Sequence, residues 1–267
     1  MTSVAVFDPR EYWETRLTEH WNLHGVGFAG YGLRYNEWLY RVRRRVFLSH
    51  VRALNLDLSR SKILDVGSGT GFYVAIWKSL RVQSITASDF TTTAVERLRK
   101  AYPDVASVQL DIGASLQAQG FAGTFDVVTA FDVLFHIIED VRFRTAVFNV
   151  SSLCRSGGYF LFSDNFLHGK TLRSPHQVHR SLEDVTTVLE EAGLHVVKRA
   201  PMFFLMNALV DTKTAWPLLF WRAIMLPVRA VPLLGAAYGA LVYPVEVCLT
   251  ALCKESPTTE IMVCQKR

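Results

Sequence analysis

The segment ILDVGSGTGFY (residues 63–73) constrains the fold of this chain more than any other stretch of its sequence. Residues 63–66 are apolar around a single aspartate, which predicts a short buried strand. Glycines then occupy every second position, Gly67, Gly69 and Gly71, and a stretch with helical spacing follows. A glycine turn between a strand and a helix brings backbone N–H groups close to a ligand. The segment therefore predicts a ligand-binding loop at the start of an α/β domain.

Short apolar runs alternate with helical stretches through the middle of the chain. After residues 63–66, strands are predicted at 84–89, 106–111, 125–131, 158–164, 194–200 and 259–267. Helices are predicted between them, for example at 181–193, where Ser181 is a typical N-cap and Gly193 follows the last turn. Such alternation predicts a doubly wound, Rossmann-like sheet, here with seven strands.

Two additions flank this core. We expect residues 1–56 to form a helical cap, 57–200 the ligand-binding core and 257–267 its last strand. Residues 201–256 are strongly apolar, but their longest charge-free run, 230–245, is shorter than the roughly 20 residues of a membrane-spanning helix. We therefore predict a helical insertion before the last strand. It could form a lid, dock on a membrane face or form a homodimer interface.

Composition excludes several classes of protein. Half of the residues are hydrophobic and a fifth are charged, which argues against disorder, collagen or a coiled coil. The first residues carry too many charges for a secretory signal, and the four cysteines form no CxxC pair. We therefore expect a cytoplasmic protein, with peripheral membrane contact as an alternative. Residues 41–45, RVRRR, accompany no nucleic-acid module, so we interpret them as a solvated helix face and expect no nucleic-acid partner.

The spacing of the glycines decides which ligand the loop is expected to hold. A dinucleotide fingerprint, GxGxxG, needs its third glycine at position 72, where this chain has phenylalanine. The sequence DxGxGxG instead resembles motif I of the class I S-adenosylmethionine-dependent methyltransferases, and the resemblance extends over residues 62–200. It implies that S-adenosylmethionine is the cofactor, that the reaction is methyl transfer, and that the acceptor is a small molecule.

Three acids follow successive predicted strands, where ligands bind in open α/β sheets. Asp65 can meet the ammonium group of the cofactor, Asp89 both ribose hydroxyls, and Asp111 the adenine amino group. Either Phe90 or Ile112 can lie against the adenine ring. The resemblance implies the same roles. The predicted cofactor-binding residues are Asp65, Gly67, Ser68, Gly69, Gly71, Asp89, Phe90, Asp111, Ile112 and Phe131.

The segment after the strand at 125–131 offers a general base. Asp132 and His136 are four residues apart, so they share a face if a helix begins there. His136 could then remove a proton from the acceptor while Asp132 orients the imidazole. This pair favours O-methylation of an apolar or aromatic acceptor. In the structural alternative, His136 packs beneath the cofactor and Asp132 caps the helix.

Two further alternatives stay open. Asp132, Asp164 and Asn165 resemble the magnesium site of the catechol O-methyltransferases, and oxygen ligands suit Mg²⁺. Those enzymes have a lysine three residues after the first acid, however, and this chain has Phe135 there. The second alternative is a non-catalytic S-adenosylmethionine-binding protein that the apolar segment recruits to a membrane or a partner.

Overall fold

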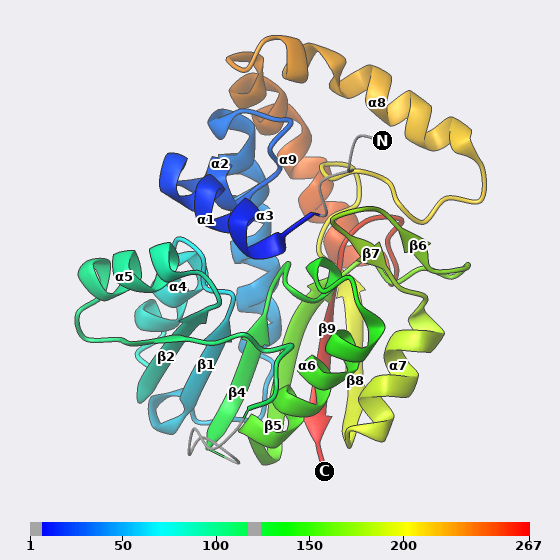
Figure 1. The fold of residues 1–267 in the computed structure, drawn as a ribbon. Helices are drawn as coiled ribbons and strands as arrows, with labels where there is room; N and C mark the ends of the chain where they lie inside the picture. The colour runs from blue at the N-terminus through cyan, green and yellow to red at the C-terminus, as the bar shows by residue number, and fades with distance from the viewer. Residues whose placement is uncertain (1–6, 117–123) are drawn as a thin grey trace, which may run out of the picture.

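The computed structural model describes residues 7–116 and 124–267. Within them, seven strands form one sheet in the spatial order β3-β2-β1-β4-β5-β9-β8 (Figure 1). The strands are β1 (Lys62–Val66), β2 (Ser84–Asp89), β3 (Ala106–Gln109), β4 (Phe125–Ala130), β5 (Cys154–Asp164), β8 (Leu194–Pro201) and β9 (Glu260–Lys266). The α-helices are α1 (Pro9–Glu19), α2 (Leu23–Val26), α3 (Leu33–Val51), α4 (Phe72–Ser79), α5 (Thr92–Ala101), α6 (Asp140–Leu153), α7 (Leu182–Glu191), α8 (Ala215–Ala230) and α9 (Leu234–Leu252). The predicted seven-stranded, Rossmann-like α/β fold is confirmed.

Strand direction places the carboxyl ends of six strands, β1 to β5 and β8, at one edge of the sheet. The strands β1 to β5 pair in parallel, whereas β9 runs antiparallel between β5 and β8. The amino end of β9, at Glu260, therefore lies at the same edge as the carboxyl end of β5, at Asp164. Loops at this edge come from seven places in the sequence and can meet around one ligand.

The sheet separates two apolar cores, because successive residues of a strand face opposite sides. In β1, Ile63 packs into the core with α3 and α4, while Leu64 and Val66 pack into the other with α6. Trp77 of α4 and Phe47 of α3 are fully buried in the first core. Both faces are covered, which is why the residues of the central strands β1 and β4 are almost all buried.

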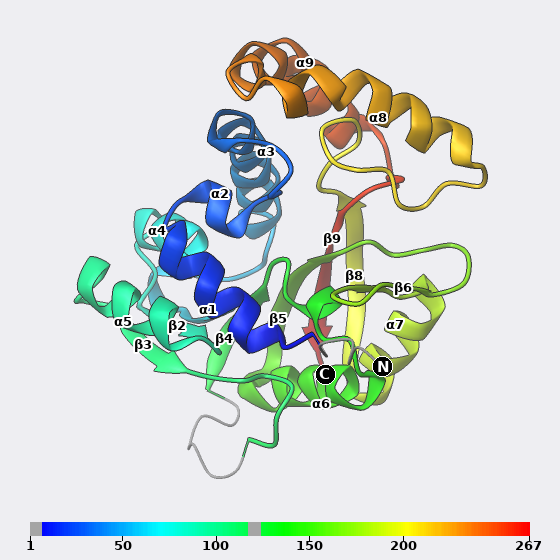
Figure 2. The same ribbon diagram turned by 45° about the horizontal axis from the view of Figure 1, so that its top comes forward.

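The cap and the insertion lie together beyond the carboxyl ends of the strands (Figures 1 and 2). The insertion contains α8 and α9, and α9 packs along α3. A Cβ at Gly239 would lie 2.3 Å from Cδ1 of Trp38, so only glycine allows this approach. The buried carboxylate of Glu246 in α9 accepts hydrogen bonds from the backbone N–H groups of Phe204 (2.7 Å) and Leu205 (2.8 Å). These contacts fix α9 to the core.

Within the described residues, α9 is the one helix long and apolar enough to cross a membrane, and 17% of its 18-residue apolar window is buried. The charge-free run counted in the sequence stopped at residue 245, because Glu246 interrupts it. The helix itself continues to Leu252.

Two local features differ from the sequence prediction. No α-helix begins at Asp132; a 3-10 turn at Leu134–His136 comes first, and α6 starts at Asp140. Asp132 has a φ of 58°, a left-handed conformation that cannot start a right-handed helix. A short hairpin, β6 (Leu172–Arg173) with β7 (Val178–His179), also lies in a segment expected to be a loop.

Candidate active site

The glycine loop connects β1 to α4 in a conformation that side chains disfavour. Gly67 has a φ of 68° and Gly69 a φ of 51°. A Cβ at Gly67 would lie 2.4 Å from Cγ2 of Val133, and one at Gly69 would lie 2.8 Å from Cγ1 of Val26. The loop is therefore closely packed between the segment after β4 and the cap. Gly67, Ser68 and Gly69 line a cavity of about 1010 Å³.

Asp89, at the end of β2, is fixed against this loop. Its Oδ2 accepts a hydrogen bond from the N–H of Gly69 at 3.0 Å, and its Oδ1 accepts from the N–H (3.0 Å) and Oγ1 (2.7 Å) of Thr91. The carboxylate is buried, which raises its pKa, and it lines the cavity. A carboxylate oxygen has two lone pairs, so Oδ2 can accept one further donor, whereas the prediction assigns both ribose hydroxyls to Asp89.

The residues predicted to bind adenine also line the cavity. Asp111 accepts a hydrogen bond from the N–H of Gly113 at 3.1 Å and pairs with Arg142 at 2.8 Å. Phe90 and Ile112 stand beside it in the cavity wall. Phe131 stacks on Tyr73, with ring centroids 4.3 Å apart, and lines the cavity as well.

The structure does not bring Asp65 or Gly71 to the cavity wall. Asp65 is 1% exposed, and its Oδ1 accepts a hydrogen bond from Oγ1 of Thr129 at 2.6 Å. Its Oδ2 has no partner among the described residues, and burial raises the pKa of the carboxyl group to about 6. Its backbone oxygen accepts hydrogen bonds from Ser68 and Ser88, so Asp65 supports the loop from behind. Its role as a direct ligand stays a prediction.

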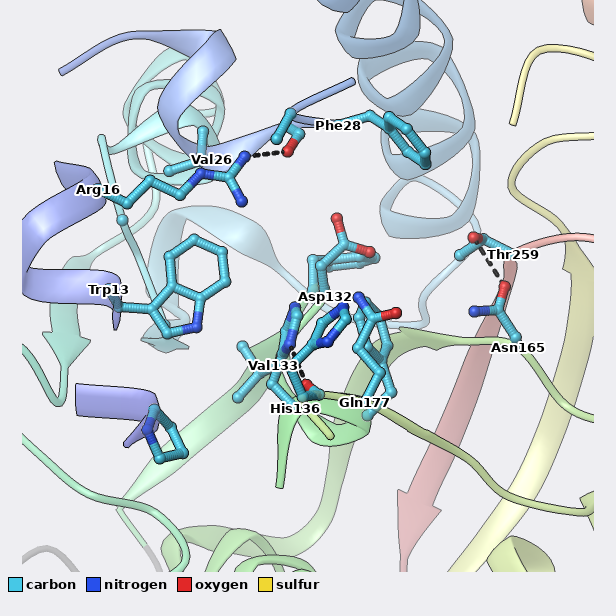
Figure 3. Close-up of a pocket in the computed structure, with 18 of the residues that line it drawn as sticks. Trp13, Arg16, Val26, Phe28, Asp132, Val133, His136, Asn165, Gln177 and Thr259 are labelled. Atoms are coloured by element: carbon cyan, nitrogen blue, oxygen red, sulfur yellow. Dashed lines mark hydrogen bonds between the residues drawn. The ribbon is translucent and has the colours of Figure 1, made fainter. Parts of the chain in front are cut away.

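These residues fit S-adenosylmethionine. The loop has no space for side chains, and the Asp89 carboxylate retains acceptor capacity. The cavity volume is at the upper end of the range for small-molecule sites, which leaves room for an acceptor beside the cofactor. Figure 3 shows the acceptor side, where Trp13, Arg16, Asp132, His136, Asn165 and Thr259 face the same space.

The predicted pair of Asp132 and His136 is not formed, because the helix that would align them is absent. The Oδ2 of Asp132 pairs with Nη2 of Arg43 at 2.7 Å, and its Oδ1 accepts a hydrogen bond from Ser163 at 2.9 Å. The Nδ1 of His136 lies 3.2 Å from the backbone oxygen of His176. Asp132 is therefore an anchor for α3, and the orienting group of His136 is a carbonyl.

His136 remains in a position to act as a base. A carbonyl only accepts hydrogen bonds, so Nδ1 carries the proton and Nε2 has the free lone pair. Burial lowers the pKa of His136 to about 4, which keeps the ring neutral near pH 7. Trp13 covers it from α1, edge to face, with ring centroids 5.2 Å apart.

Other partners occupy Asp132 and Asn165, two of the three oxygen ligands of the magnesium alternative. Arg43 already neutralises Asp132, and Asn165 bonds to His179 and Thr259. Asp164 is buried away from the cavity wall, and burial raises its pKa to about 7. Within residues 7–116 and 124–267, no group of three His, Cys, Asp or Glu side chains could hold a metal ion. The donor set does not fit Mg²⁺.

Arg43 is the site residue that the sequence interpretation missed. It was grouped with the solvated run at 41–45, yet it is 8% exposed and lines the cavity. The signal was present, because Leu39, Arg43 and Phe47 are spaced by four and share the apolar face of α3. Its neighbours Arg41, Arg44 and Arg45 are exposed, as expected.

Sequence comparison matches the central part of this chain to known proteins. Residues 64–162 match the family model described as a methyltransferase domain. Fumosorinone synthetase of Cordyceps fumosorosea is 31% identical over 130 residues, which are 45% of this chain and 3% of that protein. Ribosomal protein L11 methyltransferase of Bacillus subtilis is 28% identical over 142 residues, 51% of this chain and 39% of that protein. The chain thus spans less than half the length of either curated relative.

Solved structures share the fold at low identity. One is magnesium protoporphyrin IX methyltransferase from Synechocystis, with bound S-adenosylmethionine, at a TM-score of 0.58 and 14% identity. The superposition covers 99% of this chain and 100% of that one. The cyclase SpnF has a TM-score of 0.54 at 15% identity, with 84% of this chain and 80% of that one covered. The class I methyltransferase resemblance and the cofactor expected from the glycine loop are confirmed.

Proposed function

Since residues 64–162 form an S-adenosylmethionine-dependent methyltransferase domain, we propose that the protein methylates an oxygen of a small, apolar or aromatic acceptor with His136 as the base. One observation carries the proposal: a single cavity joins the glycine loop and Asp89 to His136. The cofactor and the group that accepts the proton would therefore share one cavity, as an in-line transfer requires.

Residues of this chain accept the proton of the acceptor and exclude water from the cavity. When bound, S-adenosylmethionine supplies a methyl group on a positively charged sulfur. As the acceptor oxygen forms its bond to carbon, its O–H proton passes to Nε2 of His136, while the carbonyl of His176 stabilises the imidazolium that results. Trp13, Tyr31 and Trp221 cover the cavity from the cap and from α8, which keeps water from competing.

The test is transfer of label from methyl-labelled S-adenosylmethionine to a cell extract, followed by separation of lipid, aqueous small-molecule and macromolecular fractions. We expect label in one of the two small-molecule fractions with the wild-type protein, and loss of label with His136→Ala. The matched control is His168→Ala, because His168 is exposed and pairs with Asp211 outside the cavity. Full activity of the His136 variant would contradict the base assignment, and label only in macromolecules would contradict the acceptor class.

A second candidate function is binding of S-adenosylmethionine without methyl transfer. The fold shared with SpnF, a cyclase, favours keeping this alternative. It predicts that calorimetry detects cofactor binding, that Asp89→Ala abolishes it, and that no fraction of any extract becomes labelled.

The location that we propose is the cytoplasm, at the surface of an anionic membrane. Large apolar side chains cover the outer face of α8 and α9: Trp216, Leu219, Phe220, Ile224, Leu226, Val231, Leu233, Leu234, Leu241, Val245 and Leu252. Monomeric soluble proteins rarely expose so large an apolar patch. Since α9 is fixed to α3 and Glu246 binds the loop at 204–205, the hairpin would lie on the bilayer rather than cross it.

Charge favours a lipid surface over a second copy of the chain. Lys213 and Lys254 flank the hairpin, and Arg34, Arg41 and Arg45 line the exposed side of α3 beside α9. None of these five forms an ion pair with another described residue. A symmetric dimer would bring the same positive rims together, whereas anionic headgroups neutralise them.

Flotation with vesicles tests this contact. Wild-type protein should float with phosphatidylglycerol-containing vesicles, and Leu219→Glu/Leu226→Glu should not. The control Val141→Glu/Val197→Glu carries the same charge on exposed apolar positions elsewhere and should still float. A wild-type dimer that becomes monomeric in the α8 variant, without flotation of either protein, would show that a second copy covers the face.

A further inference from the structure

Two arginines of α8 line the cavity without a carboxylate partner. Arg222 and Arg229 are seven residues apart, so they stand on the same side of the helix, two turns from each other. Neither forms a salt bridge or a side-chain hydrogen bond with another residue in the described parts of the chain. Both arginines are exposed as well as lining the cavity, and large apolar side chains of α8 are exposed beside them.

Arg10 also lines the cavity without an ion pair among the described residues and lies over the ring of Phe90, whereas the three remaining arginines have their charge or their donors occupied. Arg43 pairs with Asp132, and Arg142 pairs with Asp111. Arg16 donates to the backbone oxygens of His24 and Gly27 (Figure 3). The α8 side of the cavity therefore has an excess of positive charge that no described carboxylate balances.

The hydroxyl group of Tyr31 points to the same place. Tyr31 is 2% exposed and lines the cavity, and its ring packs edge to face on Trp221 at 6.1 Å. Its hydroxyl forms no hydrogen bond with any other described residue and is not among the buried polar atoms without a partner, so it is available to a ligand in the cavity. Arg229 and Arg222 lie close enough to act on its pKa, which burial raises to about 12, so the hydroxyl is a donor at neutral pH.

We infer that the acceptor is an amphiphile whose anionic group, a carboxylate or a phosphate, binds between Arg222, Arg229 and the Tyr31 hydroxyl. Two guanidinium groups and one O–H supply several donors for such a group and no acceptor that would repel it. Trp221 and Leu218 supply an apolar wall for the rest of the molecule. The inference rests on the proposed methyl transfer and adds the charge of the substrate.

The position of α8 explains why such a molecule would be selected. Its outer face is suited to a bilayer, and its arginines face the cavity, so a charged headgroup entering from the lipid surface meets them first. Figure 1 shows α8 above the carboxyl ends of the strands and away from β1 and β2. The anionic group would thus bind away from the glycine loop, with the reacting oxygen between them.

Calorimetry on the full chain tests the inference with three probes of equal chain length: decanoate, decyl phosphate and decanol. The protein is first titrated with S-adenosylhomocysteine and then with each probe. Two charge-assisted contacts predict that wild-type protein binds at least one anionic probe about tenfold or more tightly than decanol. Arg222→Gln/Arg229→Gln should lose this preference and keep its decanol affinity. The control Arg52→Gln/Arg60→Gln changes the net charge equally at exposed positions outside the cavity and should keep the preference.

Each outcome decides something specific. Preference for decanoate identifies a carboxylic acid, and preference for decyl phosphate a phosphate ester. Equal binding of all probes by wild-type protein, or equal loss in both double variants, overturns the inference. If S-adenosylhomocysteine does not bind, the proposed function fails, whereas the anion preference is still measured in the protein without it.

Discussion

Replacing Arg43 by methionine should destabilise the fold by roughly 2–3 kcal/mol, because it leaves the carboxylate of Asp132 without its cation. The guanidinium lies in the middle of α3, 2.7 Å from Asp132, and packs over the ring of Phe203 at 4.9 Å. This contact joins the cap to the strand ends. Methionine has a similar length and keeps the apolar contacts, so the loss reports mainly on charge.

The size of this destabilisation follows from the exposure of the Arg43 and Asp132 side chains. Fully exposed ion pairs contribute about 0–1 kcal/mol, and removing one partner of a fully buried pair costs about 3–5 kcal/mol. Here the side chains of Arg43 and Asp132 are 10% and 23% exposed, which places the pair between these limits. Removing both charges with Arg43→Met/Asp132→Asn should therefore recover most of the loss.

Urea unfolding at pH 7, followed by circular dichroism, measures the four free energies of this double-mutant cycle. The control is Arg44→Met on the exposed side of α3, which should change the free energy of unfolding by less than about 0.5 kcal/mol. A loss below about 1 kcal/mol for Arg43→Met, or a double variant no more stable than the single one, would refute the reasoning.

Three further predictions concern the site. Asp89→Ala should weaken S-adenosylhomocysteine binding in calorimetry about 100-fold or more, since it removes the ribose acceptor and the bond to Gly69, whereas the exposed Asp104→Ala should not. His136→Gln should reduce turnover about 100-fold without changing cofactor affinity. The wild-type rate should be flat from pH 5 to 8, because His136, with its pKa of about 4, is protonated only below that range. Burial raises the pKa of Asp164 to about 7 in the folded protein, so protonated Asp164 favours folding at low pH and this contribution is lost as pH rises. Asp164 should account for roughly 2–3 kcal/mol of the fall in stability to urea from pH 5 to pH 8, and Asp164→Asn should reduce the decline by that amount. A decline of equal size in the Asp164 variant would contradict the assignment.

The cofactor half of the site could be predicted because its determinants are local. The glycine loop is continuous in sequence, and Asp89 and Asp111 follow strands whose carboxyl ends must share an edge in a parallel sheet. Both acids line the cavity, as do Phe90 and Ile112. Asp65 is the exception, since alternation along β1 and the packing beneath the loop bury its carboxylate.

The acceptor half could not be predicted in the same way. The prediction that Asp132 orients His136 assumed a helix from spacing alone, and the left-handed backbone at Asp132 rules it out. Arg43 occupies the carboxylate instead, from a helix far away in sequence. The cap and the insertion were expected to cover the site, and Tyr31 and Trp221 line the cavity from these two parts.

The sequence by itself determined the order of strands and helices, the glycine loop and the acids that follow the strands, because hydrophobic periodicity and turn chemistry act over a few residues. Only the tertiary structure decided which charges are compensated and which face the cavity. Arg43, Arg142 and Arg222 look alike in sequence, yet the first two meet carboxylates and the third meets none among the described residues. The reason is physical: the partner of a buried charge is set by how α3, α6 and α8 pack on the sheet, and that packing depends on contacts between residues distant along the chain.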